Sequence, residues 1–487
     1  MKLWGHQETA IRATRQAIKD GARRILLVSP TGSGKTVIGS TILKAASEKF
    51  NRGIFVAPRR EIILQTSRKL DEIGLQHGII MADEKTKRSV LSMVQVCSVQ
   101  TLSSRLKSKR MEPPPANIVI FDEAHLSIAD SWQRVADEYP GAILIGLTAT
   151  PCRGDGRGLG SLYDELIEVT TVQELIDQGI LVPPKIYAPT IPDLTGVKTT
   201  AGDFNKGELE LVMDKTAMVG HIYDDWKERC SDRKTVIFAS GVKHSLHIKE
   251  LFESKGVAIA HIDGHTEKQD RDEILGDLAS GKIQAVTNAQ VLQEGWDEPS
   301  ISAMILARPT KSYALYLQQI GRGLRCHEGK TDCTVIDHAG NVYRHGYPQD
   351  AGGWTLDPDT KISDIRKEKA DSEPAIITCR NCWHTYSSLP ACPSCGCVPE
   401  QKGQAISMKE GRLREVPRKK KVQHDKQKVW LECLFKASHR GLKTGAAAHM
   451  YKKVTGVWPR KLERVPKDQQ WQMLAKDFIR ATKGMTQ

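Results

Sequence analysis

A glycine-rich turn near the N-terminus contains the first residues that could do chemistry. The turn, Ser29-Pro30-Thr31-Gly32-Ser33-Gly34-Lys35-Thr36, lies between an apolar run at 25–28 and a helical pattern at 37–50. In such a strand, turn and helix, backbone N–H groups close around phosphate oxygens, and the helix dipole adds positive charge. Lys35 is expected to reach the β- and γ-phosphates of ATP, and Thr36 to ligate Mg²⁺. The sequence therefore predicts a nucleotide site at Thr31, Gly32, Ser33, Gly34, Lys35 and Thr36.

Two adjacent carboxylates follow a second apolar run. Residues 118–121 read as a buried strand, which continues into Asp122-Glu123-Ala124-His125. A carboxylate at the end of a strand beside a phosphate loop can hold Mg²⁺ through water, and this is the role expected of Asp122. Glu123 would then lie near the γ-phosphate and orient or deprotonate the attacking water.

A third apolar run, 143–147, ends in the hydroxyl-rich sequence Thr148-Ala149-Thr150-Pro151. These hydroxyls could hydrogen-bond His125, which follows the carboxylates. We expect that bond to relay the state of the nucleotide towards a nucleic-acid groove.

Two arginines near residue 320 could complete the nucleotide site. Residues 318–325 fit the pattern Gln-x-x-Gly-Arg-x-x-Arg, with Gln318, Arg322 and Arg325 at the named positions. Guanidinium groups three residues apart lie on one face of a helix, so both can approach the same phosphate. Arg325 is expected to be the arginine finger that stabilises charge on the transferring phosphoryl group.

Five of the eleven cysteines fall within 19 residues, and four of them have zinc-ribbon spacing: Cys379, Cys382, Cys392 and Cys395. Four thiolates complete a tetrahedral shell around Zn²⁺, so the metal is expected to be structural rather than catalytic. Cys397 is interpreted as a spare, with an exchange of Cys397 for Cys395 as the alternative. Trp383, His384 and Tyr386 between the two cysteine pairs could stack on bases or form the small core of the ribbon, and both readings remain open.

Apolar runs that alternate with helical patterns are expected to position these groups. Such alternation is typical of parallel sheets, and it restarts at 234–240 after a gap, which predicts a second α/β domain. The parallel arrangement would bring the ends of several strands, with their polar residues, to one edge of each sheet.

The ordered motifs resemble those of superfamily 2 DEAD/DEAH-box helicases, which implies two tandem RecA-like P-loop domains. The resemblance implies that Gln7 reads the adenine edge, while Asp297, with Gly295 beside it, contacts ribose or organises the arginines. His125 would belong to the same nucleotide site. Nucleic-acid contacts are implied for Arg59, Arg60, Gln100, Thr101 and Thr287. For the two arginines, ordinary surface charge is the alternative.

Residues 1–345 further resemble RadD-type bacterial DNA repair helicases, through 306–310, 329–333 and Asp337-His338-Ala339-Gly340-Asn341. RadD-type proteins are longer and have a larger cysteine-rich region, so a phage-encoded helicase fits equally well. We expect RecA-like domains at 1–190 and 191–370, then a zinc ribbon at 371–400. A basic linker, 401–428, and a basic helical module, 429–487, would complete the chain.

The basic charge is confined to the C-terminal part of the chain. Residues 401–487 have a net charge of +15, whereas the first 400 residues have a net charge of −2. Such an excess favours binding to DNA or another polyanion, such as the acidic end of a single-strand-binding protein; a merely solubilising tail is the alternative. No apolar run reaches the about 20 residues of a membrane span, and no secretory signal is recognisable, so a cytoplasmic location without a membrane partner is expected.

These features together predict an ATP- and Mg²⁺-dependent helicase that acts on single-stranded, forked or branched DNA in repair, recombination or phage replication. Three alternatives stay open. The chain could move along duplex DNA without separating strands, act on RNA, or use ATP to toggle a DNA clamp that recruits partners.

Overall fold

The computed structural model describes residues 3–82, 89, 91–188, 192–200, 202–292, 296, 298–370, 376–379, 381–387 and 389–398. In the C-terminal part it describes 430, 433–434, 437 and 444–455. The chain divides into two compact units, 1–401 and 402–487, which are described separately. Within the described residues, no helix is both long and apolar enough to cross a membrane.

The first lobe is built on a seven-stranded parallel sheet in the order β3-β4-β2-β5-β6-β1-β7. The strands are β1 (Arg24–Val28), β2 (Gly53–Ala57), β3 (Gly78–Ile80), β4 (Val94–Ser98), β5 (Ile118–Asp122), β6 (Ile143–Thr148) and β7 (Glu165–Glu168). The helical elements are α1 (Gly5–Lys19), α2 (Lys35–Ser47), α3 (Arg60–Glu72), α4 (Val99–Lys107), η1 (Ala124–Leu126) and α5 (Asp130–Asp137).

Side chains on alternate residues of each strand bury the two faces of this sheet. On one face, Leu26 and Val56 pack with α4 and α5. On the other, Ile25 and Phe55 pack with α1, α2 and α3. Because both faces are covered, the strands are almost continuously apolar, as is usual for parallel sheets. The strands expected before the glycine-rich turn, before the two carboxylates and before Thr148 are confirmed as β1, β5 and β6.

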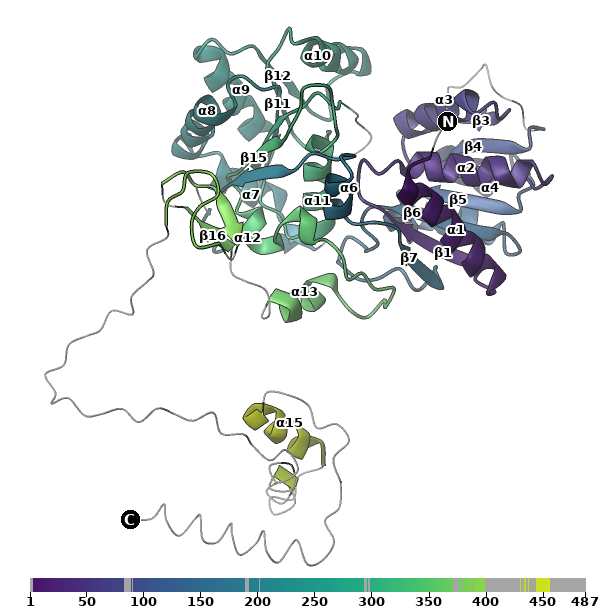
Figure 1. Cartoon of the computed structure of the whole chain (residues 1–487). Helices are drawn as coiled ribbons and strands as arrows, with labels where there is room; N and C mark the ends of the chain where they lie inside the picture. The colour runs from purple at the N-terminus through teal and green to yellow at the C-terminus, as the bar shows by residue number, and fades with distance from the viewer. Residues whose placement is uncertain are drawn as a thin grey trace, which may run out of the picture. The chain divides into compact units, whose positions relative to one another are not determined.

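The second lobe contains a six-stranded parallel sheet in the order β12-β13-β11-β14-β15-β8. Figure 1 labels β11, β12 and β15 of this sheet. The strands are β8 (Pro184–Tyr187), β11 (Thr235–Ala239), β12 (Ile259–Ile262), β13 (Ala285–Asn288), β14 (Ala303–Ala307) and β15 (Cys333–Asp337). The helical elements are α6 (Val172–Asp177), α7 (Lys206–Met213), α8 (Thr216–Cys230), α9 (Val242–Ser254), α10 (Lys268–Ser280), α11 (Tyr313–Gly323), α12 (Asn341–His345), η2 (Pro348–Asp350) and α13 (Ile362–Ala370). A short antiparallel hairpin joins β9 (Thr199–Thr200) to β10 (Asp203–Phe204).

The expected boundary between the lobes at residue 190 differs from the observed strand pairing. Strand β8 precedes that boundary but pairs with β15, in register from Cys333 opposite Pro184. It therefore belongs to the second sheet. The chain enters the second lobe by its edge strand and returns to its centre only at β11, so local periodicity could not identify the sheet to which β8 belongs.

A small antiparallel pair, β16 (Ile376–Thr378) and β17 (Thr385–Ser387), lies beside β8. The Thr385 hydroxyl donates to the carbonyl of Ile186 at 2.9 Å, and the Ala188 N–H donates to the carbonyl of Trp383 at 3.2 Å. The cysteine-rich segment thus covers part of an edge strand, which would otherwise expose backbone groups to other chains.

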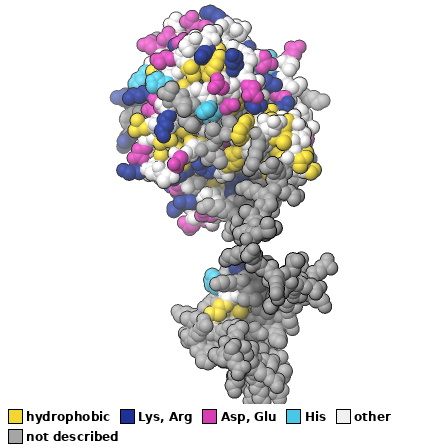
Figure 2. All heavy atoms as spheres, turned by 90° about the vertical axis from the view of Figure 1, so that its left-hand side faces the viewer, with side chains coloured by type: hydrophobic (Ala, Val, Ile, Leu, Met, Phe, Trp, Pro, Cys, Tyr) yellow, Lys and Arg dark blue, Asp and Glu magenta, His cyan; other side chains and the backbone are white. Residues whose placement is uncertain are grey.

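The surface of the large unit has no single sign of charge in the view of Figure 2. Acidic and basic side chains are interspersed on the face that corresponds to the left-hand side of Figure 1. This mixture agrees with the net charge of −2 for the first 400 residues.

The second unit contains α15 (Thr444–Thr455), which lies within the helical module expected at 429–487. Trp430 and Tyr451 are buried together, with ring centroids 5.7 Å apart in an edge-to-face contact. Trp430 is therefore a core residue. The predicted linker 401–428 and residues 456–487 of the predicted helical module lie outside the described residues.

Candidate functional site

The glycine-rich turn forms a phosphate-binding loop between β1 and α2. The Ser33 hydroxyl donates to the carbonyl of Pro30 at 2.7 Å, and Gly34 caps α2 at φ +79°. A Cβ at Gly34 would overlap the amide nitrogen of Gln7, and a Cβ at Gly32 would lie 2.8 Å from Leu181. Glycine is therefore required at both positions by backbone conformation and by space. The first N–H groups of α2 provide the positive end of a helix for an anion.

Gln7 supports this loop from behind. Its amide nitrogen donates to the carbonyl of Ser33 at 3.1 Å, and its amide oxygen accepts from the Trp4 N–H at 3.1 Å. His6 donates from Nε2 to the same Ser33 carbonyl at 2.8 Å. Gln7 thus has a bracing contact that the sequence motif did not indicate, while its expected reading of adenine stays a prediction.

Lys35 lies among two carboxylates and the arginines of the second lobe. Its ammonium group donates to the carbonyls of Ser29 and Pro30 at 3.3 and 3.4 Å. Burial lowers the pKa of Lys35, and nearby Glu123 and Asp122 partly oppose this effect. An additional anionic group in this site, such as a phosphate, would therefore raise the pKa of Lys35 and favour its charged form.

The surroundings of Asp122 and Glu123 shift the pKa values of the two carboxyls in opposite directions. Burial, followed by repulsion from Glu123, raises the pKa of Asp122 to about 7. Burial acts in the same direction on Glu123, but His125, Lys35 and other cations outweigh it and lower the pKa of Glu123. Glu123 is therefore the carboxyl that stays ionised most readily, as a water-activating base requires.

The third apolar strand brings Thr148 to His125. The imidazole Nδ1 of His125 lies 3.3 Å from the Thr148 hydroxyl, which confirms the predicted hydrogen bond. The Thr148 hydroxyl also accepts from the Thr150 N–H at 3.1 Å. His125, which follows the two carboxylates, is therefore linked through the Thr148 hydroxyl to the loop after β6.

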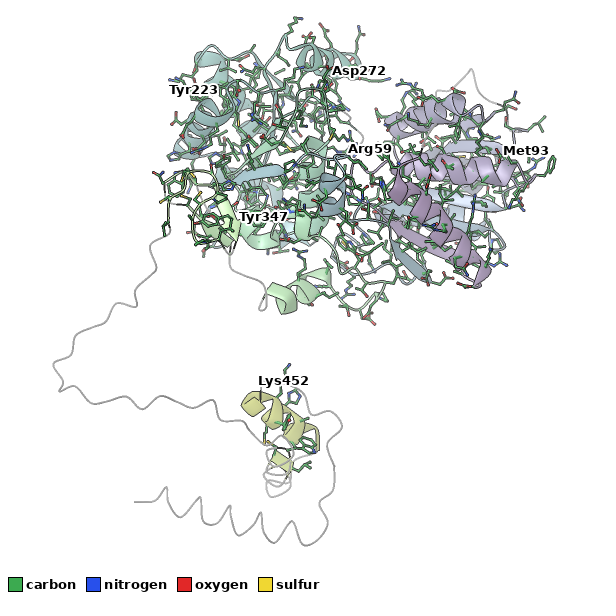
Figure 3. The ribbon with its side chains drawn as sticks, in the orientation of Figure 1. Arg59, Met93, Tyr223, Asp272, Tyr347 and Lys452 are labelled. Atoms are coloured by element: carbon green, nitrogen blue, oxygen red, sulfur yellow. The ribbon has the colours of Figure 1, made fainter. Side chains whose placement is uncertain are left out.

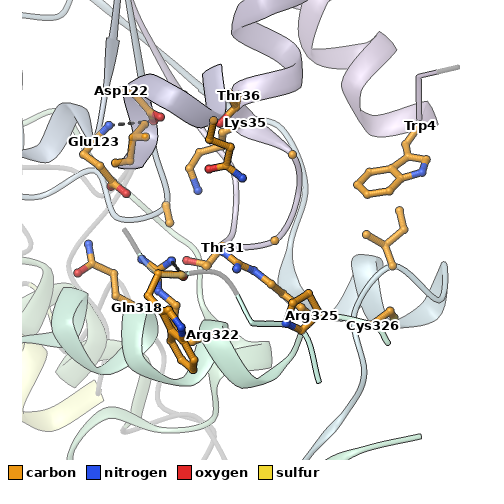
Figure 4. Close-up of a pocket in the computed structure, with 18 of the residues that line it drawn as sticks. Trp4, Thr31, Lys35, Thr36, Asp122, Glu123, Gln318, Arg322, Arg325 and Cys326 are labelled. Carbon is orange, nitrogen blue, oxygen red and sulfur yellow. Dashed lines mark hydrogen bonds between the residues drawn. The ribbon is translucent and has the colours of Figure 1, made fainter. Parts of the chain in front are cut away.

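The second lobe presents α11 to the phosphate loop. A Cβ on Gly321 would lie 2.7 Å from the Thr31 Cβ, so the helix backbone approaches the loop closely at this point. Arg322 is almost fully buried and donates to the carbonyl of Trp296 at 2.8 Å. In Figure 4, Gln318, Arg322 and Arg325 face Lys35, Asp122 and Glu123 across the pocket.

Arg325 is held differently from the prediction. Helix α11 ends at Gly323, so Arg322 and Arg325 do not share a continuous helix face. Instead, Arg325 forms an isolated β-bridge with Leu181, and its Cγ would lie 3.5 Å from a Cβ on Gly32. Burial lowers its pKa to about 10, so the guanidinium remains charged at neutral pH.

A cleft of about 730 Å³ lies between these groups. It is lined by the predicted residues Thr31, Gly32, Gly34, Lys35, Thr36, Asp122, Glu123, Gln318, Arg322 and Arg325. Ser33 is buried behind it, and Gly295 and Asp297 lie outside the described residues.

Several lining residues were missed from the sequence, namely Trp4, Gln178, Gly179, Ile180, Trp296, Pro299 and Cys326. Trp4 and Cys326 are close in sequence to recognised motifs, so proximity could have indicated them. Residues 178–180 belong to no recognised motif. Only the fold brings them to the cleft, so the sequence could not have indicated them.

The predicted nucleic-acid residues differ in burial and in their contacts. Arg59 lies where the first lobe faces the second (Figure 3), and its charge contributes to the lowered pKa of Glu123. Gln100 is exposed and accepts from the Ser98 hydroxyl at 2.9 Å, while the Thr101 N–H is bonded to that hydroxyl at the start of α4. These contacts leave the nucleic-acid roles of the residues as predictions.

Two further members of this predicted set have interior contacts. Arg60 is half-buried and lies 3.9 Å from the Met81 sulfur. The Thr287 side chain is fully buried, with its hydroxyl 2.9 Å from that of Ser245. Contact between Thr287 and a nucleic-acid backbone would therefore require this segment to rearrange.

The four cysteines with ribbon spacing come together. The sulfur atoms of Cys379, Cys382, Cys392 and Cys395 all lie within 4.8 Å of one another. Two sulfur pairs, Cys379–Cys395 and Cys382–Cys392, are each 3.5 Å apart. Four sulfurs at about 2.3 Å from a tetrahedral Zn²⁺ are separated by about 3.8 Å, so the donor set fits this metal.

The three aromatic residues of the ribbon have different environments. Tyr386 is buried with Cys379 and Cys392, and His384 packs against the Tyr187 ring at 5.3 Å. Trp383 remains 40% exposed and has a φ of +60°. Of the two open readings, the core role therefore fits Tyr386. His384 is half-buried against β8, and the Trp383 ring stays the most exposed of the three.

Comparisons with known proteins agree with the two-lobe arrangement. A family model for the res subunit of type III restriction enzymes matches residues 1–153, and one for the conserved C-terminal domain of helicases matches residues 214–327. The 51.5 kDa protein of a Lactococcus phage is 31% identical over 329 residues, covering 68% of each chain. IRC3 of Saccharomyces cerevisiae, described as an ATP-dependent helicase, is 31% identical over 356 residues; the match covers 69% of this chain but 51% of the yeast protein.

The fold also matches a solved fragment of an HsdR subunit of a type I restriction enzyme from Vibrio vulnificus. The TM-score is 0.55 at 22% identity, covering 73% of this chain and 67% of that fragment. At this identity the likeness shows the shared fold alone.

Proposed function

Because the chain belongs to superfamily 2 of the ATP-dependent helicases, we propose that it is a DNA motor. It couples ATP hydrolysis to movement along, or remodelling of, single-stranded, forked or branched DNA. One observation carries the proposal: a single cleft is lined by Lys35 and Glu123 from the first lobe and by Arg322 and Arg325 from the second. A setting in repair, recombination or phage replication is part of the proposal, with the phage relative as its support.

The residues of the first lobe fit Mg-ATP. Lys35 would bind the phosphates, while the Thr36 hydroxyl and the Asp122 carboxylate, which both line the cleft, would hold Mg²⁺. The bound metal would neutralise phosphate charge. Glu123 is kept ionised by its cationic neighbours and would orient and deprotonate the attacking water.

Hydrolysis is coupled to movement because the catalytic groups belong to different lobes. Arg322 and Arg325 stabilise the developing charge only while the second lobe is closed on the first. After hydrolysis that attraction weakens, and the lobes can separate. A cycle of closing and opening therefore converts ATP turnover into motion along a strand.

DNA is favoured over RNA as the track. The family model for the first lobe describes a subunit of restriction enzymes, and this likeness supports DNA. The RNA helicase, the duplex translocase without strand separation and the ATP-toggled clamp remain the rival functions.

A strand-displacement assay separates these functions. We expect ATP-dependent release of a labelled strand from forked DNA, and little release from the matching RNA fork. Displacement of a triplex-forming strand without unwinding of the fork would indicate the duplex translocase. Equal release from the RNA fork would contradict the choice of DNA, and binding without any displacement would favour the clamp.

The cysteine cluster is proposed to hold one structural Zn²⁺ that keeps the ribbon on β8. A thiolate ligand is lost in Cys395→Ser, whereas Cys397→Ser removes a neighbouring thiol that packs against the cluster but is not among the four sulfurs within 4.8 Å of one another. We expect about one zinc per chain in the unchanged protein and in Cys397→Ser, and a markedly lower content in Cys395→Ser. Elemental analysis of the purified proteins measures this; equal zinc loss in both variants would contradict the ligand assignment.

The basic C-terminal unit is proposed to add sequence-independent affinity for DNA through its net charge of +15. The acidic end of a single-strand-binding protein is a second candidate for the same charge.

A further inference from the structure

The chain crosses between the lobes a second time after α12. Residues 346–370, here named the strap, leave the second lobe, pass through η2 and end in α13. In Figure 1 the green chain before α13 extends towards β7 of the first lobe. The nucleotide chemistry described above does not use this segment.

The strap is bonded to the first lobe through its backbone. The Gly160 N–H donates to the carbonyl of Leu356 at 2.7 Å, and the Gly158 N–H donates to that of Asp357 at 3.1 Å. In the other direction, the Ile362 N–H donates to the carbonyl of Gly156 at 2.8 Å. The bonded loop, 153–160, follows directly after the segment whose Thr148 contacts His125.

Two glycines in this loop are required by the strap itself. A Cβ on Gly158 would lie 2.5 Å from the carbonyl carbon of Leu356, and a Cβ on Gly160 would overlap the Leu356 oxygen. Neither glycine has a positive φ, so alanine would be compatible with the loop backbone. By contrast, a Cβ on Gly154 in the same loop would meet no atom within 4 Å.

On its other side the strap contacts the start of α11. Trp354 packs against the hydrophobic clusters of both lobes, and its ring lies 5.7 Å from that of Tyr313. From α13, Arg366 lies over the Tyr313 ring at 4.2 Å and donates to the Tyr313 hydroxyl. Tyr313 is the first residue of the helix that contains Gln318 and Arg322.

The strap also closes a space beside the phosphate loop. Ala351 and Trp354 line a small, mainly apolar cavity together with Pro30, Thr31 and Gly321. The same cavity wall therefore includes the phosphate loop, the arginine-bearing helix and the strap.

We propose that the strap positions the arginines of the second lobe for ATP hydrolysis. By tying loop 153–160 to the start of α11, Trp354 sets how Arg322 and Arg325 approach the phosphate loop. ATP binding should depend on it little, because Lys35, Thr36 and Asp122 all belong to the first lobe. Trp354 acts through α11, so it is a positioning residue and not a catalytic one.

The test uses the full-length chain and the double variant Gly158→Ala/Gly160→Ala, with Gly154→Ala as the matched control. Because a misplacement of about 1 Å can cost on the order of 10²-fold in rate, we expect kcat for ATP to fall about 10- to 100-fold. We expect the KM for ATP to stay within about twofold, the signature of an interaction made mainly in the transition state. Gly154→Ala should keep both values.

Trp354→Ala and Trp354→Phe provide a second test that leaves the glycines in place. Alanine should reproduce the loss of kcat, and phenylalanine should restore much of it. An unchanged kcat in both Gly158→Ala/Gly160→Ala and Trp354→Ala would overturn the proposal. A rise in the KM for ATP that matches the fall in kcat would also overturn it. Hydrolysis is measured with and without DNA. If DNA does not stimulate the enzyme, the rates without DNA still show whether the strap affects hydrolysis.

Discussion

Replacing Arg325 by alanine is expected to lower the rate of ATP hydrolysis about 10³–10⁵-fold, the typical contribution of an arginine finger. Arg325 lines the nucleotide cleft from the second lobe and is half-buried there. Its guanidinium would meet the charge that develops on the transferring phosphoryl group. ATP itself should still bind, because the phosphate loop and the Mg²⁺ ligands are unchanged. Single-turnover hydrolysis and binding of a fluorescent ATP analogue measure the two effects separately.

Lysine should be a poor substitute at position 325. Burial lowers the pKa of Arg325 to about 10, from a value that is ordinarily two units above that of lysine. A lysine in the same environment would lose part of its charge near neutral pH, and it lacks the planar fork of donors. Arg15→Ala on the exposed side of α1 is the control for loss of an arginine. Hydrolysis within tenfold of the unchanged protein in Arg325→Ala would contradict the finger assignment.

Replacing Glu123 by glutamine is expected to slow hydrolysis by about 10²–10⁴-fold, the range for loss of a positioned general base. Glutamine has nearly the same shape, so the hydrogen bond from the residue 123 N–H to Asp122 should persist. The variant should therefore bind ATP and remain in the closed, ATP-bound form. Rapid-quench hydrolysis and nucleotide-binding titrations measure these properties.

Glu138→Gln is a suitable comparison, because Glu138 is exposed at the end of α5 and does not line the cleft. It should hydrolyse ATP at the unchanged rate. If Glu123→Gln also kept that rate, another group would have to activate water, and the division of roles between Asp122 and Glu123 would be wrong.

The nucleotide site could be predicted in detail because its residues occur in short, ordered segments. Lys35, Asp122 and Glu123 each follow an apolar strand, and parallel pairing places the ends of β1 and β5 at the same edge of one sheet. The spacing of the cysteines similarly predicted their meeting, since two close pairs need only one turn of chain to converge. In both cases local sequence determines most of the geometry.

Contacts between distant segments could not be predicted in this way. Nothing near Pro184 indicates that β8 joins the second sheet, and nothing near Trp354 indicates that it packs against both lobes. Spacing alone also predicted that Arg322 and Arg325 share one face of a helix. Helix α11 instead ends at Gly323, and Arg325 forms a β-bridge with Leu181. Thr287 was expected to face a nucleic-acid backbone, but tertiary packing buries it against Ser245.

The most direct test of the central claim is the steady-state rate of ATP hydrolysis with different nucleic acids. The rate would be measured without nucleic acid and with single-stranded DNA, forked DNA, duplex DNA and RNA, for the unchanged protein, Glu123→Gln and Arg325→Ala. A DNA motor predicts strong stimulation by DNA in the unchanged protein and its loss in both variants. Equal stimulation by RNA, or no stimulation by any nucleic acid, would contradict that claim.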